Sequence, residues 1–396
     1  MAGATIPFNR PGLAGNEWRY ISEALEAMHI SGDGAFTRKC QALLENELGA
    51  ARVLLTTSCT AALEMTALLL NLREGDEIIV PSFAFVSTVN AYVLRGAVPV
   101  FCDIRPDTLN LNESKIEELI TPRSKGIVVV HYAGIGAEME HILRIADNAG
   151  IAVIEDNAHG LFGRRGGRYL GSFGPFATQS FHETKNFFCG EGGALVINEA
   201  AFVDRAEVLW EKGTNRKRFF QGLVDKYSWI DVGSSFLPSD LLAAFLYAQL
   251  EARHAIQKKR GAIWHRYHNE LKEWAMENNV QQPCIPEECE NPYHMYYLLL
   301  PDGEQRNAFI QAMHQKGVMC VFHYLPLHLS QMGIKFGGRP AQCPVTESIS
   351  DCIVRLPFFT GMTDSEIDTL IAAIKTISIP IGKPSPHISH SGGSSC

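Results

Sequence analysis

The chain has 396 residues, of which 46% are apolar and 20% charged, and its formal net charge is −8 at pH 7. This length and composition indicate a globular protein with material for one large and one small domain. The negative net charge argues against a surface that coats nucleic acid, although it leaves room for a local basic patch. No apolar run approaches the roughly 18 residues that span a bilayer, and the first residues lack the pattern of a signal peptide. We therefore expect a cytoplasmic protein with neither a nucleic-acid nor a membrane partner.

The ten cysteines are scattered without regular spacing and form no Cys-x-x-Cys pair. In a chain without an export signal this pattern indicates reduced thiols. Cys284 and Cys289 are the nearest pair, but no histidine or further cysteine lies close enough to complete a tetrahedral set. We therefore expect no metal site.

Residues 50–200 alternate short apolar runs with helical patterns. Five runs are β-branched and bounded by turn residues, as in strands buried on both faces: residues 53–55, 78–80, 98–101, 127–130 and 151–155. Helix formers at helical spacing occupy stretches between them, such as residues 61–72 and 138–149. This alternation predicts an α/β fold, a mainly parallel sheet wrapped by helices, with ligands at the carboxyl ends of the strands.

A polar, strongly helical stretch at residues 241–278 is predicted to bridge to a second unit. Beyond it, two apolar runs and two helical patterns suggest a smaller C-terminal α+β domain: residues 296–300, 318–322, 305–316 and 364–377. The boundaries that we expect are 1–250 for a large cofactor-binding domain, 251–379 for the small domain and 380–396 for a disordered tail. The tail is rich in Pro, Ser, Gly and His, so it buries too little apolar surface to offset the entropy of ordering.

Two residues have settings that suit pyridoxal 5′-phosphate (PLP). Asp156 closes the apolar run 151–155, and Lys185 follows Ser180 by five residues and precedes a Gly-rich turn at 190–193. PLP needs an amine to hold its aldehyde as a Schiff base and a carboxylate to keep its pyridine nitrogen protonated. Alone, Asp156 could equally be a helix cap and Lys185 a solvated lysine. Their combination with Ser180 and the turn favours the cofactor.

The phosphate of that cofactor needs backbone donors and hydroxyl groups. Residues 57–60, which include Cys59 and Thr60, lie between a predicted strand and the helix that opens at Ala61. A helix N-terminus presents free N–H groups to an anion, although ordinary capping explains the same residues. Ser180 supplies a further hydroxyl from a neighbouring strand end.

Other side chains are candidates for the ring and the substrate. Phe85, preferred over Phe83, could stack on the pyridine ring, unless both are core residues. His159 could bond the phenolic oxygen of the cofactor or serve as a structural turn residue. His323 and His328, with Tyr324 between them, follow a predicted strand of the small domain and are candidate substrate contacts.

The densest basic cluster of the chain spans residues 212–218 and includes Lys212 and Arg216. It is polar and interrupted by glycine, so we expect a loop that binds a diphosphate, with a solvated charged loop as the alternative. The sequence contains no phosphate loop of the G-x-x-x-x-G-K-[ST] type, no strand-linked G-x-G-x-x-G and no H-E-x-x-H.

Taken together, these residues resemble the DegT/DnrJ/EryC1/StrS sugar-nucleotide aminotransferases, which are fold-type-I PLP enzymes. The resemblance runs from Ile6 to about Ile377. The stretches that carry it are residues 85–88, 105–108, 131–134, 181–186, 211–216, 224–227 and 233–235. Within the family, they are nearest to the enzymes that form dTDP-4-amino-4,6-dideoxygalactose for enterobacterial common antigen.

The resemblance implies that Lys185 is the Schiff-base lysine, Asp156 the pyridinium partner and Ser180 a phosphate ligand, with backbone donors from Cys59 and Thr60. It implies a homodimer with shared active sites, in which some relatives bring an asparagine from the neighbouring subunit to the phosphate. The matching position here is Leu237.

The activity that the resemblance implies is transfer of an amino group from L-glutamate to the C4 ketone of dTDP-4-dehydro-6-deoxyglucose. Alternatives are a 3- or 4-aminotransferase on another nucleotide ketosugar, a PLP sugar dehydratase and a non-catalytic PLP-binding regulator. Related dehydratases carry histidine at the lysine position, and the chain has no appended DNA-binding segment, so Lys185 and the acidic composition favour the aminotransferase.

Overall fold

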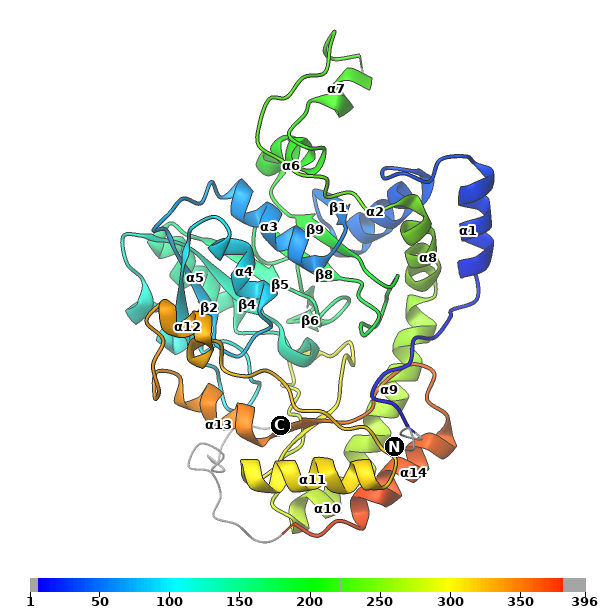
Figure 1. Ribbon diagram of the computed structural model, residues 1–396, viewed down its shortest axis with the longest axis vertical. Coiled ribbons are helices and arrows are strands. Elements are labelled where there is room, and N and C mark those ends of the chain that lie inside the picture. Colours follow the sequence, from blue (N-terminus) through cyan, green and yellow to red (C-terminus); the bar gives the residue numbers. More distant parts are fainter. Residues whose placement is uncertain (1–5, 221, 380–396) are drawn as a thin grey trace.

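The computed structural model describes residues 6–220 and 222–379 (Figure 1). The segment 380–396, for which the sequence predicts disorder, lies outside these residues. Within the described part of the chain, no helix is both long enough and apolar enough to cross a membrane.

The centre of the molecule is a seven-stranded sheet with the strand order β1-β9-β8-β5-β4-β2-β3. Its strands are β1 (Arg52–Thr56), β2 (Glu77–Pro81), β3 (Val98–Cys102), β4 (Ser124–Val130), β5 (Ala152–Asp156), β8 (Phe176–Ser180) and β9 (Gly193–Ile197). All neighbours pair in parallel except β9, which runs antiparallel to both β1 and β8. The five strands predicted from the sequence are confirmed, and the sheet is mainly parallel as expected. The carboxyl ends of β5 and β8 therefore lie side by side.

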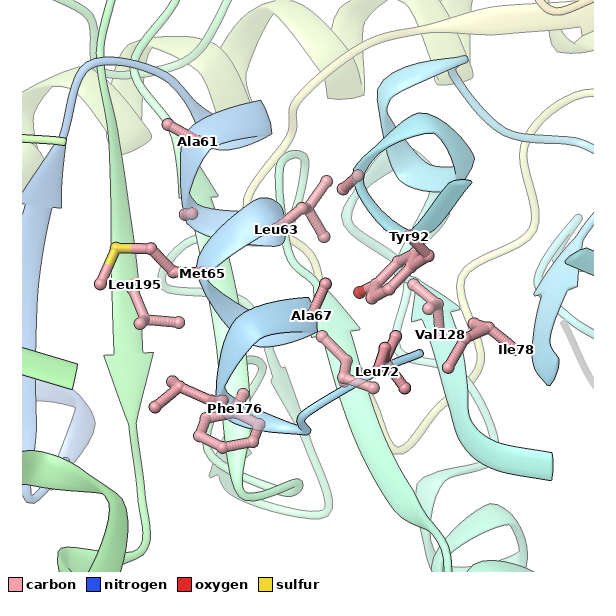
Figure 2. Packing of buried hydrophobic residues seen from close by; sticks show 14 of the residues in the cluster. Ala61, Leu63, Met65, Ala67, Leu72, Ile78, Tyr92, Val128, Phe176 and Leu195 are labelled. Atoms are coloured by element: carbon pink, nitrogen blue, oxygen red, sulfur yellow. The ribbon is translucent and has the colours of Figure 1, made fainter. Parts of the chain in front are cut away.

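Helices cover both faces of this sheet (Figure 1). On one face, α3 (Cys59–Leu69), α4 (Ser87–Val93) and α6 (Val203–Trp210) share a buried cluster with residues of the strands. Figure 2 shows this packing, in which Leu63 and Ala67 of α3 lie near Tyr92 of α4, and Phe176 and Leu195 come from β8 and β9. This apolar contact holds α3 in place, with its N-terminus toward the carboxyl ends of β5 and β8.

The other face is covered by a second set of helices, namely α2 (Ala35–Leu48), α5 (Met139–Ala149) and α8 (Asp240–Glu251). Alternate residues of a strand divide between the faces: Leu54 packs with α3, whereas Val53 and Leu55 pack with α2 and α8. This alternation follows from the period of two in a strand, and it accounts for the continuous apolar runs in the sequence.

A separate apolar cluster lies in the C-terminal part of the chain, where α9 (Arg253–Glu270), α10 (Lys272–Glu277), α11 (Gly303–Gln315) and α14 (Asp364–Lys375) enclose β11 (Tyr297–Leu299) and β12 (Ile353–Arg355). The N-terminal Ile6 belongs to the same cluster and pairs with Val318. The apolar run 318–322 thus forms isolated bridges rather than a strand of a ladder. The domain boundary at residue 250 stays a prediction.

The remaining α-helices and strands are α1 (Glu17–Glu26), α7 (Arg216–Phe220), α12 (Gln331–Lys335), α13 (Pro344–Cys352), β6 (Arg164–Arg165), β7 (Arg168–Tyr169) and β10 (Cys289–Glu290). The predicted helix at 241–278 consists of α8, α9 and α10 in succession. The basic segment 212–218, expected to be a loop, enters α7 from Arg216 onward. Short helices of this kind depend on their surroundings rather than on intrinsic propensity.

Candidate active site

A cavity of about 450 Å³ lies at the carboxyl ends of the parallel strands and extends to the C-terminal part of the chain. The sequence-predicted residues that line it are Cys59, Thr60, Phe85, Asp156, His159, Ser180, Lys185, His323 and Tyr324. They come from elements far apart in the sequence, and the sheet topology brings them to one place. This cavity is the candidate active site.

Asp156 ends β5 and is only 5% exposed. The hydroxyl of Thr88 donates to its Oδ2 at 2.7 Å, and the N–H of Ala158 donates to its Oδ1 at 3.3 Å. Burial raises the pKa of Asp156, and the two hydrogen bonds and the charge of Lys185 oppose that rise. A buried carboxylate held in this way is suited to pair with a protonated ring nitrogen.

Lys185 lies on the segment that joins β8 to β9 and is half-buried. Backbone hydrogen bonds close this segment, with the N–H of Phe181 donating to Gly192 O at 2.8 Å and the N–H of Cys189 donating to Phe181 O at 2.9 Å. Burial lowers the pKa of the Lys185 amine to about 8, and nearby Asp156 partly offsets this effect. The amine is therefore neutral in an appreciable fraction of molecules near neutral pH, which suits a nucleophile.

The turn between β1 and α3 forms an anion cradle. Ser58 caps α3 by accepting from the N–H of Ala61 at 3.1 Å, and the N–H groups of Cys59 and Thr60 have no partner among the described residues. Free N–H groups at the first turn of a helix attract anions. A Cβ on Gly193 would lie 2.4 Å from Cys59 N, so only glycine lets β9 approach this turn.

Hydroxyl groups complete the cradle. The Thr60 hydroxyl donates to Ser87 Oγ at 2.8 Å, and Ser180 lies at the end of β8, where it pairs with Gly193. Ser87 and Ser180 also line the cavity.

Stacked rings form part of the cavity wall. His159 stacks on His294 with ring centroids 4.3 Å apart and planes 18° apart, and His323 stacks on Tyr324 at 3.5 Å. Burial lowers the pKa of His159, His294 and His323 well below the usual range, so these rings are neutral. Nδ1 of His159 is buried without a hydrogen-bond partner in the described part of the chain. The backbone of Tyr324 is strained, because its φ is 35° and bulky residues rarely adopt a positive φ. Strained backbone of this kind is concentrated at functional sites.

Phe83 and Phe85, which the sequence could not fully separate, have different surroundings. Phe83 is 1% exposed and packs against Tyr132 at 5.1 Å, so it is a core residue. Phe85 is 57% exposed and lines the cavity. The position of Phe85 is therefore the one that permits contact with a ligand.

Two predicted substrate contacts, Lys212 and Arg216, do not line the cavity of their own chain. Both lie near Glu211, with N···O distances of 3.6 Å, and α7 projects beyond α6 at one end of the molecule (Figure 1). Within a single chain, the structure does not bring these cations to the candidate site.

The position of His328 does not fit its predicted contact with substrate. Its side chain is fully buried outside the cavity. Its Nδ1 lies 2.6 Å from Ser82 Oγ, and its Nε2 lies 3.0 Å from Glu347 Oε1. The correction is that His328 joins the end of β2 to α13, because the short helical turn after Pro326 directs it inward.

Three residues of the site escaped the sequence reasoning. Thr88 supports Asp156, His294 supports His159, and Arg355 at the end of β12 adds a cation to the cavity. Thr88 lies in the stretch 85–88, which contributes to the family resemblance, but the sequence reasoning assigned Thr88 itself no role. Arg355 follows an apolar strand and carries no motif, so no local signal marks it.

A larger hollow of about 900 Å³ lies beside α9, but it contains neither Lys185 nor Asp156. Its rings pair with one another, as when Trp264 stacks on His268 at 4.7 Å. Among the described residues, no group of three or more His, Cys, Asp or Glu side chains could hold a metal ion. Of these two cavities, the smaller one contains both Lys185 and Asp156.

The residues of this cavity fit PLP. An anion cradle, an amine of lowered pKa and a buried carboxylate match the phosphate, the aldehyde and the ring nitrogen of that cofactor. The unpartnered Nδ1 of His159 leaves one more polar group for it. A mainly parallel sheet with these groups at its carboxyl edge defines a fold-type-I PLP-dependent enzyme.

Comparison with known proteins makes the class specific. The model of the DegT/DnrJ/EryC1/StrS aminotransferase family matches residues 12–375, and the chain belongs to this family. It is 30% identical to the spore coat polysaccharide biosynthesis protein SpsC of Bacillus subtilis over 94% of this chain and 97% of SpsC. The enzyme is thus a PLP-dependent aminotransferase.

Solved structures agree with this assignment. The aminotransferase TlmJ from Streptoalloteichus hindustanus has a TM-score of 0.86 and 27% identity, covering 94% of this chain and 98% of TlmJ. Spr1654 from Streptococcus pneumoniae, in its PMP (pyridoxamine phosphate) form, has a TM-score of 0.87 and 25% identity, covering 94% of this chain and 98% of Spr1654.

Proposed function

We propose that the protein transfers the amino group of L-glutamate to the C4 ketone of dTDP-4-dehydro-6-deoxyglucose, which gives dTDP-4-amino-4,6-dideoxygalactose and 2-oxoglutarate. The observation that carries the proposal is that Lys185 and Asp156 line one cavity together with the anion cradle at α3. The similarity to SpsC, a polysaccharide biosynthesis protein, supports a sugar as the amino acceptor.

Each group that binds the cofactor has a separate task in this proposal. The N–H groups of Cys59 and Thr60 and the hydroxyl of Ser180 bind the phosphate, and Asp156 holds the proton on the ring nitrogen. Phe85 covers the ring, and His159 bonds the phenolic oxygen. PLP, when bound, withdraws electrons from the carbon that carries the transferred nitrogen.

Lys185 has a second task besides holding the cofactor. Once its amine is displaced by the substrate nitrogen, it moves a proton between the substrate carbon and the cofactor. A pKa of about 8 suits the Lys185 amine both for accepting the proton from the substrate carbon and for returning it. A general acid–base works best when its pKa is near the operating pH.

The nucleotide sugar needs cations that one chain does not bring to its own cavity. We propose that Lys212 and Arg216 reach the cavity of a second copy and bind the sugar's diphosphate, while His323 and Tyr324 contact the sugar. Exposed apolar side chains of the same region support a homodimer, since Trp229 is 80% exposed. Leu237 has an apolar side chain that is half-buried against the core of its own chain. It therefore cannot bind a phosphate as the asparagine of some relatives does.

The cofactor's absorbance tests the proposal in two stages. L-glutamate alone should remove the absorbance band of the lysine-bound cofactor, and a nucleotide ketosugar should restore it. A regulator without turnover would keep the band, and a dehydratase would not be converted by glutamate. Mass spectrometry and NMR of products from a panel of nucleotide ketosugars then identify the base, the carbon aminated and its stereochemistry. Amination of a different ketosugar would overturn the proposed substrate while leaving the aminotransferase intact.

A further inference from the structure

The larger hollow of about 900 Å³ beside α9 is a second candidate binding site. Its walls come mainly from α9, from the strands β6, β7 and β10, and from the segments 282–285 and 291–293. A volume of this size is within the range of small-molecule sites, about 300–1,000 Å³. The hollow and the cavity with Lys185 have no lining residue in common, so the cofactor and its substrates leave the hollow unused.

Aromatic rings make up much of the lining. Trp264 stacks on His268 of the same helix with ring centroids 4.7 Å apart, and the Tyr293 ring lies 5.8 Å from Trp264. Phe162 and Tyr169, whose ring centroids are 6.5 Å apart, add two rings from outside α9. The φ of Tyr293 is 54°, which is rare for a bulky residue, and backbone strain of this kind is concentrated at functional sites.

The guanidinium and carboxylate groups of the lining balance one another. They belong to two arginines and two glutamates, Arg164, Arg253, Glu47 and Glu290. Arg253 and Glu47 form an ion pair. Arg164 lies over the Tyr169 ring at 4.0 Å, and Glu290 is its partner residue in the pairing of β6 with β10. A strongly charged ligand would therefore meet as much repulsion as attraction.

Three carboxamide side chains of the lining have unused hydrogen-bonding groups. Gln282 donates two hydrogen bonds from its amide nitrogen, and its carbonyl oxygen has no partner among the described residues. Gln257 and Asn291 each use the carbonyl oxygen as an acceptor, and their amide N–H groups have no partner in the same part of the chain. The hollow therefore offers both donors and acceptors to a ligand.

We propose that this hollow binds an uncharged oligosaccharide, an inference that goes beyond the proposed transamination and does not depend on its sugar acceptor. The C–H groups of sugar rings pack against the electron-rich faces of aromatic side chains. Sugar hydroxyls both donate and accept, so they satisfy the free groups of Gln257, Gln282 and Asn291. An apolar ligand would bury these groups without partners, which is costly, and the balanced charges favour neither an anion nor a cation.

Only a thin partition separates the hollow from the active-site cavity. Tyr293 lines the hollow, and the next residue, His294, lines the cavity. Asn186, which follows Lys185, contacts both sides of the partition: its Nδ2 donates to Gln257 Oε1 at 3.4 Å, and its Oδ1 lies 2.9 Å from His294 Nδ1. A ligand that contacts Gln257 and Tyr293 therefore acts on groups that hold the segment of Lys185. Its binding should change the rate of the glutamate half-reaction.

Calorimetric titration of the holoenzyme with chitotriose, cellotriose and maltotriose tests the site, because these trisaccharides carry neither a charge nor a nucleotide. At least one of them should bind at one site per chain. Tyr169→Ala removes a ring of the lining, and Gln282→Met removes a carboxamide at nearly constant volume. Each substitution should weaken that binding about tenfold or more.

The matched control is Tyr247→Ala. Tyr247 is also half-buried beneath a cation, Lys39, but it is outside the hollow. Tyr247→Ala should bind the trisaccharide like the unmodified enzyme.

Cofactor absorbance measures the coupling to the active site. The bound trisaccharide should change the rate constant of the glutamate half-reaction by about fivefold or more, the lower end of the coupling between linked sites. At the same trisaccharide concentration the effect should be lost in Tyr169→Ala and kept in Tyr247→Ala.

Several results would overturn the inference. Absence of binding for all three trisaccharides would do so, as would binding that neither Tyr169→Ala nor Gln282→Met weakens. Tighter binding of glucose 6-phosphate, lost in Arg164→Gln, would make the hollow an anion site instead. Binding that leaves the half-reaction unchanged would refute the coupling to Lys185 and retain the ligand. Failure of the proposed acceptor is recognised separately, because the nucleotide ketosugars are assayed without trisaccharide.

Discussion

The pKa of Lys185 makes a quantitative prediction about how the enzyme without cofactor captures PLP. Burial lowers this pKa from 10.5 to about 8. Only the neutral amine attacks the aldehyde, and at pH 7 about a tenth of the molecules have it when the pKa is 8, against about 0.03% for an ordinary lysine, a difference of about 300-fold. The rate of covalent capture should rise about tenfold from pH 6 to pH 7 and level off above about pH 9.

Stopped-flow absorbance of the apoenzyme mixed with PLP measures this rate, and borohydride reduction followed by peptide mapping identifies the lysine. We expect the adduct on Lys185, with Lys185→Ala still binding PLP but forming no adduct. Because the charge of Arg355 lowers the pKa of Lys185, Arg355→Met should move the midpoint to higher pH. A rate that keeps rising beyond pH 10, or an adduct on Lys212 or Lys226, would refute the reasoning.

Four substitutions test other parts of the site. Asp156→Asn removes the charge beside the ring nitrogen, so transamination followed by cofactor absorbance should fall by at least about 10²-fold; near-normal activity would assign the task to another carboxylate. Thr88→Val removes the hydroxyl that donates to Asp156 and raises the pKa of Asp156 further. Because the ionised carboxylate is the active form, the acid limb of the pH–rate profile should move to higher pH, and an unmoved limb would contradict this role. Arg216→Ala should weaken the nucleotide-sugar half-reaction and leave the glutamate half-reaction almost intact; the reverse pattern would place Arg216 at the donor. His328→Ala should lower the free energy of unfolding in urea by about 1–3 kcal/mol, because it leaves the buried Ser82 hydroxyl without its partner, and neither KM should change.

The sequence by itself determined five of the seven strands of the central sheet, together with the cofactor, whereas β8 and β9 were not predicted. Short apolar runs that are rich in β-branched residues and bounded by turn residues favour interior strands, so residues 78–80 and 127–130 were recognisable without tertiary information. Lys185 and Asp156 were recognisable because each follows a strand or precedes a Gly-rich turn, where local sequence already fixes the backbone. The reactive groups of PLP are few, and their chemical needs restrict which residue types can serve them.

The tertiary structure alone decided which distant residues share the cavity. His323 and His328 lie five residues apart on one segment, yet one faces the cavity and the other is buried against Ser82 and Glu347. Arg355 belongs to no motif, and the role of Thr88 follows from its contact with Asp156, which lies 68 residues away in the sequence. Local sequence specifies backbone conformation through short-range sterics and hydrogen bonds, whereas the partners of a side chain depend on how the packed elements are oriented. That orientation is set by the burial of the whole apolar surface, which no single segment encodes.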